Sequence, residues 1–330
     1  MVKAIYDFDV AAFGAEVSPY FEGGAVWGVG VSGGGDSTAL LLALVTAGFG
    51  EQLVALCMNN GWGEADEEAE AHVRALCERL NVRLVVGQGA GYPQSGSWEA
   101  IARDERMSLF AEQAKMLKLA GVMLAHNAED VFEQMLMRMG RGAGLAGLTG
   151  LGADTTTQAY GDVTLRLVRP ILPVTRGALR DFLVREGHAW YDDPFNDDDG
   201  KMRGRIRAVL PALLAAGMTL DGVLSCVAAL EEAEDVVSCE LSVVSNALSV
   251  EEGVVRFPRD VLVRLPVELA VRVVQAMLDE GRRAAGLPME VVRRGKRAGL
   301  WGRICEAETG VSELGGARFF WDAGVVRVTF

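Results

Sequence analysis

A glycine-rich turn between residues 29 and 44 carries the residue types best suited to chemistry. The segment reads VGVSGGGDSTALLLAL, a β-rich run followed by three glycines and then by helical composition. Glycine places no Cβ between the backbone and a bound anion, and the N–H groups of a helix N-terminus attract negative charge. Asp36 stands at this helix start, where a carboxylate could help to hold a cation. The segment therefore predicts a phosphate-binding turn.

Two common phosphate-binding motifs overlap in this turn, and each makes a further demand on the sequence. Gly28, Gly30 and Gly33 satisfy GxGxxG, but a dinucleotide site also needs an acid at the end of the next strand. That strand ends at residues 57–60, CMNN, without an acid. A loop of the GxxxxGK[ST] type is excluded because Asp36 stands where its lysine would be.

Ser32 is a candidate nucleophile, because residues 30–34, GVSGG, satisfy the GxSxG turn of serine hydrolases. His126 or His188 could then serve as the general base. That fold places several strands before its nucleophile, whereas only one expected strand precedes Ser32. A serine hydrolase is therefore an alternative that the strand order disfavours.

The whole string at residues 32–37, SGGGDS, satisfies a third motif, SGGxDS. It resembles the PP-loop ATP pyrophosphatases, which cleave ATP between the α and β phosphates and activate a substrate as its adenylate. The resemblance implies a parallel-sheet α/β domain that uses ATP and Mg²⁺. The residues expected to bind ATP are Ser32, Gly33, Gly34, Gly35, Asp36, Ser37 and Met58.

Further stretches resemble, in order and spacing, the tRNA(Ile)-lysidine synthetase family. Residues 99–106, EAIARDER, are similar to its EAxARxxR helix. Residues 126–148 are similar to HHxDDQxET followed by RGxGxxGL. Residues 169–170, 193–198 and 203–211 are similar to its RP, DPSNxD and RNxIRxxLP stretches. The resemblance implies a cytoplasmic ligase that adenylates the wobble cytidine of an isoleucine tRNA with a CAU anticodon and couples lysine to it.

Residue types in these stretches suit that chemistry, which requires the charge of the triphosphate to be neutralised. Glu129 and Asp130 can each share a helix face with Glu133, where they could hold a metal ion or the lysine ammonium. His126 is a candidate acceptor for the lysine proton. The expected catalytic residues are Asp36, His126, Glu129, Asp130 and Glu133, with Asp36 and Asp130 as metal ligands. The arginines expected to contact phosphates of ATP or tRNA are Arg103, Arg106, Arg138, Arg141, Arg203, Arg205 and Arg207.

Several residues depart from the family's motifs near the expected reaction centre. A second histidine, an aspartate, a glutamine, a threonine and an asparagine of the motifs are replaced by Asn127, Glu129, Val131, Gln134 and Gly204, respectively. An NHGL-like turn is replaced by NNGW at residues 59–62. The alternative is therefore a diverged PP-loop paralogue that binds ATP but acts on another acceptor or has lost ligation. Thiolases of the superfamily are disfavoured, because no CxxC pair occurs.

Hydrophobic periodicity places these motifs on alternating strands and helices. Buried strands are expected at residues 25–31, 52–58, 82–87, 121–126 and 165–174, with amphipathic helices between them. This alternation predicts a parallel sheet covered on both faces. The expected domains are residues 1–216, the PP-loop domain, and residues 217–330, a smaller, mainly helical domain that binds tRNA. Within the second, helices are expected at 220–249 and 268–280, and a hairpin at 317–330.

The composition restricts where this protein works and what it binds. A net charge of −13 and a pI near 4.8 argue against general nucleic-acid binding, so RNA must meet a local basic patch. Residues 282–303 supply one, with seven basic residues against one glutamate. The acids near the N-terminus and the interrupted apolar runs predict neither a secretory signal nor a membrane span. The five cysteines are expected to be reduced core residues, and the apolar C-terminal helices could support a homodimer.

Overall fold

The computed structural model describes residues 3–92, 98–149, 151–160, 163–192 and 202–330. The chain forms two compact units. The N-terminal unit comprises residues 1–143 and 147–229, and the C-terminal unit comprises residues 144–146 and 230–330.

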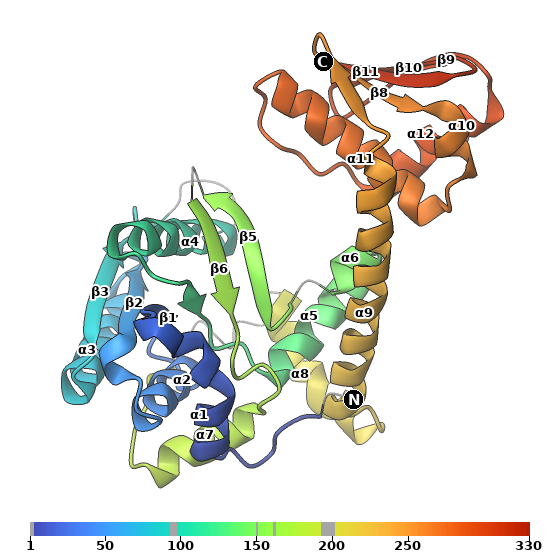
Figure 1. The fold of residues 1–330 in the computed structure, drawn as a ribbon. Helices are drawn as coiled ribbons and strands as arrows, with labels where there is room; N and C mark the ends of the chain where they lie inside the picture. The colour runs from blue at the N-terminus through green and yellow to red at the C-terminus, as the bar shows by residue number, and fades with distance from the viewer. Residues whose placement is uncertain (1–2, 93–97, 150, 161–162, 193–201) are drawn as a thin grey trace. The chain divides into compact units, whose positions relative to one another are not determined.

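The N-terminal unit contains a six-stranded sheet in the order β3-β2-β1-β4-β6-β5 (Figure 1). The first five strands in this order run parallel, and β5 pairs antiparallel with β6. The parallel strands confirm the alternation predicted from the sequence, whereas the polar edge strand β5 lacks the apolar run that would have revealed it. The strands are β1 (Trp27–Gly30), β2 (Leu53–Asn59), β3 (Arg83–Gln88), β4 (Val122–Met123), β5 (Asp154–Tyr160) and β6 (Val163–Val168).

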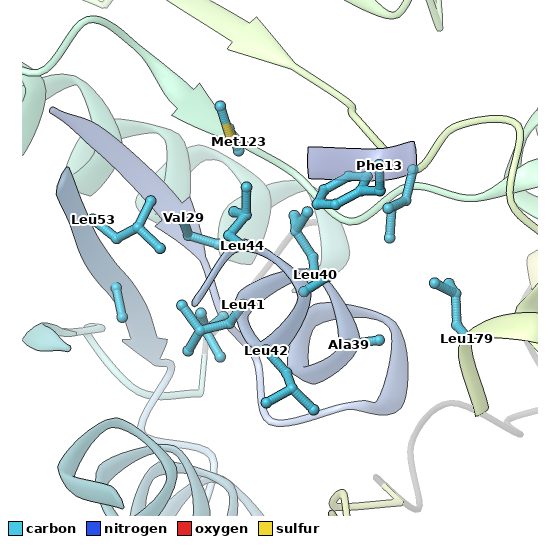
Figure 2. Packing of buried hydrophobic residues seen from close by; sticks show 14 of the residues in the cluster. Phe13, Val29, Ala39, Leu40, Leu41, Leu42, Leu44, Leu53, Met123 and Leu179 are labelled. Atoms are coloured by element: carbon cyan, nitrogen blue, oxygen red, sulfur yellow. The ribbon is translucent and has the colours of Figure 1, made fainter. Parts of the chain in front are cut away.

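Helices cover both faces of this sheet because alternate strand residues point in opposite directions. In β2, Leu53, Ala55 and Cys57 pack into one apolar cluster with α1, α2, α3 and α7, while Val54 and Leu56 pack with α4 on the other face. Figure 2 shows Leu44 and Leu41 of α2 beside Val29 of β1, in the same apolar cluster. The helices up to residue 215 are α1 (Val10–Val17), α2 (Gly35–Thr46), α3 (Glu64–Leu80), α4 (Trp98–Leu117), α5 (Ala128–Gly140), α6 (Leu145–Leu148), α7 (Arg176–Arg185) and α8 (Met202–Ala215), with 3₁₀ turns at Ser18–Gly24 and Gly50–Gln52.

The long helix α9 (Leu220–Ser245) contributes to both units. Its first turns place Leu220, Val223 and Val227 in a cluster with Val131 and Phe132 of α5. The compact units consequently divide at residues 229 and 230, inside this helix, whereas the domain boundary predicted at 216/217 lies in the loop before it. The pattern of the sequence changes at that loop, but the first turns of α9 pack against α5, and the N-terminal unit therefore extends into this helix.

The C-terminal unit combines helices with an antiparallel sheet in the order β7-β8-β11-β10-β9. The predicted hairpin is confirmed as β10 and β11, where Asp322 Oδ1 accepts the N–H groups of Gly324 and Val325 at 2.9 and 3.0 Å. The expected helices are also present, but the sequence analysis did not identify the other three strands of the sheet, β7, β8 and β9. The elements are β7 (Ser249–Glu251), β8 (Val254–Pro258), α10 (Arg259–Arg264), α11 (Val267–Ala284), α12 (Arg294–Glu306), β9 (Gly310–Leu314), β10 (Ala317–Trp321) and β11 (Val325–Thr329).

Two further expectations from the sequence concern the cysteines and the apolar helices. All five cysteines are free, but only Cys57 and Cys77 are buried, so the expectation of core positions was wrong for Cys226, Cys239 and Cys305. Within the described residues, no single helix is both long and apolar enough to cross a membrane, and only the pair α8 and α9, bent by 108°, meets that criterion together.

Candidate active site

The glycine-rich turn connects β1 to α2, and its serine hydroxyl groups form hydrogen bonds within the turn itself. Ser37 Oγ accepts the N–H of Ser32 at 3.2 Å and donates to the carbonyl oxygen of Gly34 at 3.0 Å. Gly33 has a φ of +86°, and a Cβ there would lie 3.3 Å from the carbonyl oxygen of Ala69. Gly34, the N-cap of α2, offers no side-chain cap to the first-turn N–H groups. The turn is therefore preformed, with helix N–H donors suited to an anion.

A second segment, Trp190 and Tyr191, braces this turn. The N–H of Tyr191 donates to the carbonyl oxygen of Gly33 at 3.0 Å. A Cβ on Gly35 would lie 3.5 Å from the indole of Trp190. These contacts join residues about 160 positions apart, and the short aromatic pair carries no motif. The sequence analysis consequently missed this support for the turn.

Asn127 connects the glycine-rich turn to the acidic end of α5. Its Nδ2 donates to Asp36 Oδ2 at 2.9 Å. Its Oδ1 accepts the N–H of Asp130 at 3.0 Å, while Asp130 Oδ2 accepts the N–H of Asn127 at 3.1 Å. This reciprocal capping box fixes the start of α5. Asn127 therefore orients two of the predicted acids at once.

The predicted acids Asp130 and Glu133 are paired with arginines of α8. Arg203 Nη2 lies 2.8 Å from Asp130 Oδ1, and Arg203 Nε lies 2.7 Å from Glu133 Oε2. Arg207 Nε lies 2.7 Å from Glu133 Oε1. The Glu133 side chain is fully buried, so it requires these charged donors. Arg203 and Arg207, predicted to contact phosphates, thus neutralise carboxylates here.

Arg176, the first residue of α7, was not predicted and lies among the acids. Its guanidinium is 3.7 Å from Asp36, 3.9 Å from Asp130 and 3.5 Å from Glu133. Its backbone N–H donates to Glu129 Oε2 at 2.9 Å. Glu129 therefore caps the start of α7 and holds Arg176 in place. The motif that singled out Glu129 carried no information about this partner, because it lies 47 residues further along the chain.

Burial raises the pKa of Asp36 to about 6. The negative charges of Asp130 and Glu129 act in the same direction, and the nearby guanidinium of Arg176 opposes them. Ionised Asp36 is therefore destabilised by its lost hydration, and a bound cation would offset this free-energy cost. Among the described residues, no group of three or more histidine, cysteine or acidic side chains could hold a metal. Mg²⁺ commonly uses one or two carboxylates with phosphate oxygens, and Asp36 fits that pattern.

His126 is held neutral by its surroundings. Its Nδ1 accepts a hydrogen bond from Arg169 Nε at 3.2 Å, so the imidazole proton belongs on Nε2. Burial, with the positive charges of Arg169, Arg203 and Arg106, lowers the pKa of His126 to about 4, although Asp130 opposes the change. Arg169 is fixed in turn by the carbonyl oxygen of Gly152 at 2.7 Å. This geometry favours His126 as a hydrogen-bond donor over a proton acceptor at Nδ1.

We expect the neutral state of His126 to affect stability at acidic pH. Its folded-state pKa lies below the ordinary value, so its contribution to stability is complete above pH 6.5 and is lost as the pH falls toward 4. Asparagine can still accept from Arg169 but does not titrate. The difference in Tm between the wild type and His126→Asn should therefore change in favour of the variant between pH 7 and 4.5. Thermal unfolding across this range tests the prediction, and a constant difference would contradict it.

A cluster of arginines lies close to His126. Arg103 carries a positive charge that lowers the pKa of Arg106, Arg138 and Arg169, in each case together with the larger effect of lost hydration. Guanidinium groups that gather in this way are suited to binding an anion such as a phosphate. The side chains of Arg103 and Arg106 remain accessible to solvent. Three of these four arginines were predicted to contact phosphates, and the structure brings them together.

The remaining predicted residues lie in different surroundings. Arg138 donates to the carbonyl oxygen of Gly147, and Arg141 is exposed, with Nη2 3.8 Å from Met202 Sδ. Arg205 is exposed on α8. Met58 lies near the end of β2, where a Cβ on Gly87 would approach its sulfur at 2.9 Å. The matched residues 193–198 lie outside the described residues.

The family model of the PP-loop domain matches residues 12–213, more than half of the chain. The chain belongs to this family. The match includes the glycine-rich turn, α5, Arg176 and the arginines of α8, so the residues described above lie within the PP-loop domain.

Related proteins agree with this assignment. The tRNA(Ile)-lysidine synthase of Zymomonas mobilis is 37% identical over 186 residues, covering 56% of this chain and 55% of that protein. The enzyme of the same name from Mesorhizobium japonicum is 36% identical over 203 residues, covering 60% and 44%. The chain thus matches about half the length of these curated relatives. The U34-tRNA thiolase NcsA of Methanococcus maripaludis has the same fold, with a TM-score of 0.56 and 14% identity over 67% of this chain and 77% of that one.

The hydrogen bonds of Ser32 and of the two histidines also bear on the serine hydrolase alternative. Both histidines considered as a base for Ser32 are bonded to arginines: His126 to Arg169, and His188 Nδ1 to Arg79 Nη2 at 2.7 Å. The Ser32 hydroxyl instead lies 3.2 Å from Ser37 Oγ. The described hydrogen bonds therefore contain no serine–histidine pair for a hydrolase.

Proposed function

We propose that this PP-loop protein is a tRNA(Ile)-lysidine synthetase that acts in the cytoplasm. It would transfer AMP from ATP to the wobble cytidine of an isoleucine tRNA with a CAU anticodon, releasing pyrophosphate, and then replace the AMP with lysine. The observation that carries the proposal is the hydrogen bond from Asn127 to Asp36. It connects the SGGGDS turn, which we expect to bind ATP, to the acidic first turn of α5. Relatives named tRNA(Ile)-lysidine synthase support it over more than half of the chain.

The chain's own groups have distinct tasks in this reaction. The N–H groups of residues 33–37 would bind the ATP phosphates, and Asp36 would hold Mg²⁺, whose charge offsets theirs. Asp130, the other predicted metal ligand, has Oδ1 on Arg203 and Oδ2 on the N–H of Asn127, so we assign it to fixing α5. Arg103 and Arg106 would bind phosphates of ATP or RNA.

His126 would donate a hydrogen bond from its Nε2–H group to an oxygen atom of the reacting groups. Its Nδ1 lone pair is used by Arg169, and its low pKa makes it a weak base at neutral pH. Removal of the proton from the lysine amine would then require another acceptor. The neutral imidazole supplies polarity without adding a charge beside the arginines.

The C-terminal unit would bind tRNA outside the reacting nucleotide. It contains a pocket of about 1230 Å³ whose lining includes the four cations Arg293, Lys296, Arg303 and Arg318 and the two acids Glu290 and Glu313. Three of the four cations belong to the basic segment 282–303 noted in the sequence. A concave surface with this charge suits a phosphate backbone, even in a protein that is acidic overall.

Incorporation of labelled lysine into tRNA tests the proposal directly. The purified protein would be incubated with ATP, Mg²⁺, labelled lysine and bacterial tRNA, and the product treated with mild alkali. Alkali removes lysine held as an aminoacyl ester but leaves lysine bonded to a base. Alkali-stable label is the expected result. ATP binding without label would overturn the proposal and favour a diverged PP-loop protein with another acceptor.

A further inference from the structure

Three aromatic side chains form a cluster at the ends of β2 and β3, outside the residues assigned above. The ring centres of Trp62 and Tyr92 are 6.2 Å apart, with planes inclined by only 18°. Trp98, the first residue of α4, lies 6.0 Å from Trp62 and 5.2 Å from Tyr92. Tyr92 and Trp98 are 53% and 47% exposed. The three rings thus contact one another, but large parts of Tyr92 and Trp98 remain exposed to solvent.

Backbone groups hold two of the three rings, those of Trp62 and Tyr92. Trp62 Nε1 donates to the carbonyl oxygen of Gly91 at 3.2 Å, and the Tyr92 hydroxyl donates to the carbonyl oxygen of Trp62. Gly61 and Gly91 both have positive φ, and a Cβ on Gly61 would lie 3.3 Å from Gly91 Cα. This close approach of two loops requires glycine and fixes the two rings relative to each other. The exposed faces are therefore preorganised.

Acidic side chains lie on the α3 side of the cluster, whereas α4 carries both acids and arginines, with Glu105 Oε1 accepting the N–H of Ala90 at 3.1 Å. The N–H of Trp62 donates to Asp66 at 2.8 Å, and Asp66 belongs to the acidic first turn of α3. On the other side, α4 continues from Trp98 to Arg103 and Arg106, about 8 and 12 Å further along the helix axis. Arg103 and Arg106 have solvent-accessible side chains. Arg103 and Arg106 are the cations of α4 that would bind phosphates of an RNA whose base lies on the rings.

We propose that Trp62, Tyr92 and Trp98 form a stacking surface for an unpaired nucleobase of the RNA substrate. The inference rests on the proposed function for the presence of RNA. Bases splayed out of RNA loops stack on exposed aromatic rings, and neighbouring arginines bind their phosphates. A small nucleotide is instead enclosed in a concave site. The exposure of Tyr92 and Trp98 therefore favours a base of RNA over the adenine of ATP.

The test measures RNA binding directly and does not depend on catalysis. The probe is a fluorescent anticodon stem-loop with a CAU anticodon, bound to the full chain without ATP. Trp98→Leu keeps an apolar side chain but removes the ring, and we expect it to weaken binding about 10-fold. Trp98→Phe should retain most of the affinity. Met116→Ala, an exposed apolar site near the end of the same helix, is the matched control and should bind like the wild type.

An abasic scan of the loop identifies the stacked base. Removing that base should weaken binding to the wild type but have little further effect on Trp98→Leu, because both changes remove one stacking contact. Equal RNA affinity of the wild type and Trp98→Leu would overturn the proposal. A raised KM for ATP with unchanged RNA affinity would also overturn it, in favour of adenine. Failure of lysine incorporation alone, with this binding pattern intact, would count against the proposed ligase and support the stacking surface.

Discussion

Asp36→Asn should reduce ATP-dependent pyrophosphate release by about 100-fold or more while leaving the protein folded. The side-chain oxygen of asparagine can still accept from Asn127 Nδ2, so the bond of 2.9 Å between the turn and α5 can persist. The negative charge that would hold Mg²⁺ is lost. Pyrophosphate release and ATP binding by the purified variant measure the effect. Turnover at the wild-type rate would show that the turn has been assigned the wrong chemistry.

The same substitution should stabilise the ligand-free protein at neutral pH. The pKa of Asp36 is raised to about 6, so between roughly pH 4 and 6 the folded state binds more protons than the unfolded state. Its contribution to stability is consequently greatest below the unfolded pKa and is lost as the pH rises through 6. Asparagine lacks this loss, and the gain at pH 7.5 should be about 1–2 kcal/mol after allowing for partial exposure.

Thermal unfolding from pH 4 to 8, with a chelator and without nucleotide, provides the second measurement. The Tm difference between Asp36→Asn and the wild type should grow in favour of the variant as the pH rises. His126 contributes an opposite slope, but it is present in both proteins and cancels in the difference. Asp7→Asn is the control, because the Asp7 side chain is 97% exposed. Parallel profiles for Asp36→Asn and the wild type would contradict the prediction.

The sequence predicted those strands and turns that are specified by a short run of consecutive residues. The buried strands β1 and β2 and the partly exposed edge strand β3 all appear as apolar runs, and each was found within a few residues of its bounds. The SGGGDS turn was recognisable because phosphate binding there depends on consecutive backbone groups. Strand β5 was missed because its sequence, DTTTQAY, contains few apolar residues.

The sequence could not predict how charges distant along the chain would be paired. Asp36 and Asn127 are 91 residues apart, and Glu133 and Arg207 are 74 apart. A motif can indicate that a residue is functional without indicating its partner. Arg203 and Arg207 were therefore assigned to phosphates, although they balance acids, and Arg176 received no role. The departure at Asn127, which suggested altered chemistry, also has a structural explanation in the capping box of α5.

Glu133→Ala should be among the most destabilising single changes in the N-terminal unit. Both carboxylate oxygens of Glu133 accept charged donors at 2.7 Å, one from Arg203 and one from Arg207. Its side chain is fully buried, whereas those of Arg203 and Arg207 are 40% and 28% exposed. Removing the acid leaves guanidinium groups without their main counter-charge, which costs about 3–5 kcal/mol at a buried pair. For a unit of this size the Tm should fall by about 10 °C.

A double-mutant cycle separates the charge pairing from the cavity that alanine leaves. Arg207→Ala alone should be less destabilising than Glu133→Ala, because Arg203 can still bind the carboxylate. The double variant should be less destabilised than the sum of the two, with a coupling of about 1–3 kcal/mol. Glu112→Gln, an exposed acid on α4, should leave the Tm unchanged. Additive effects would mean that Glu133 is stabilised by packing alone. Coupling would instead identify the acid as the counter-charge that holds α8 against α5, because a buried carboxylate retains its position only where fixed cations offset its lost hydration.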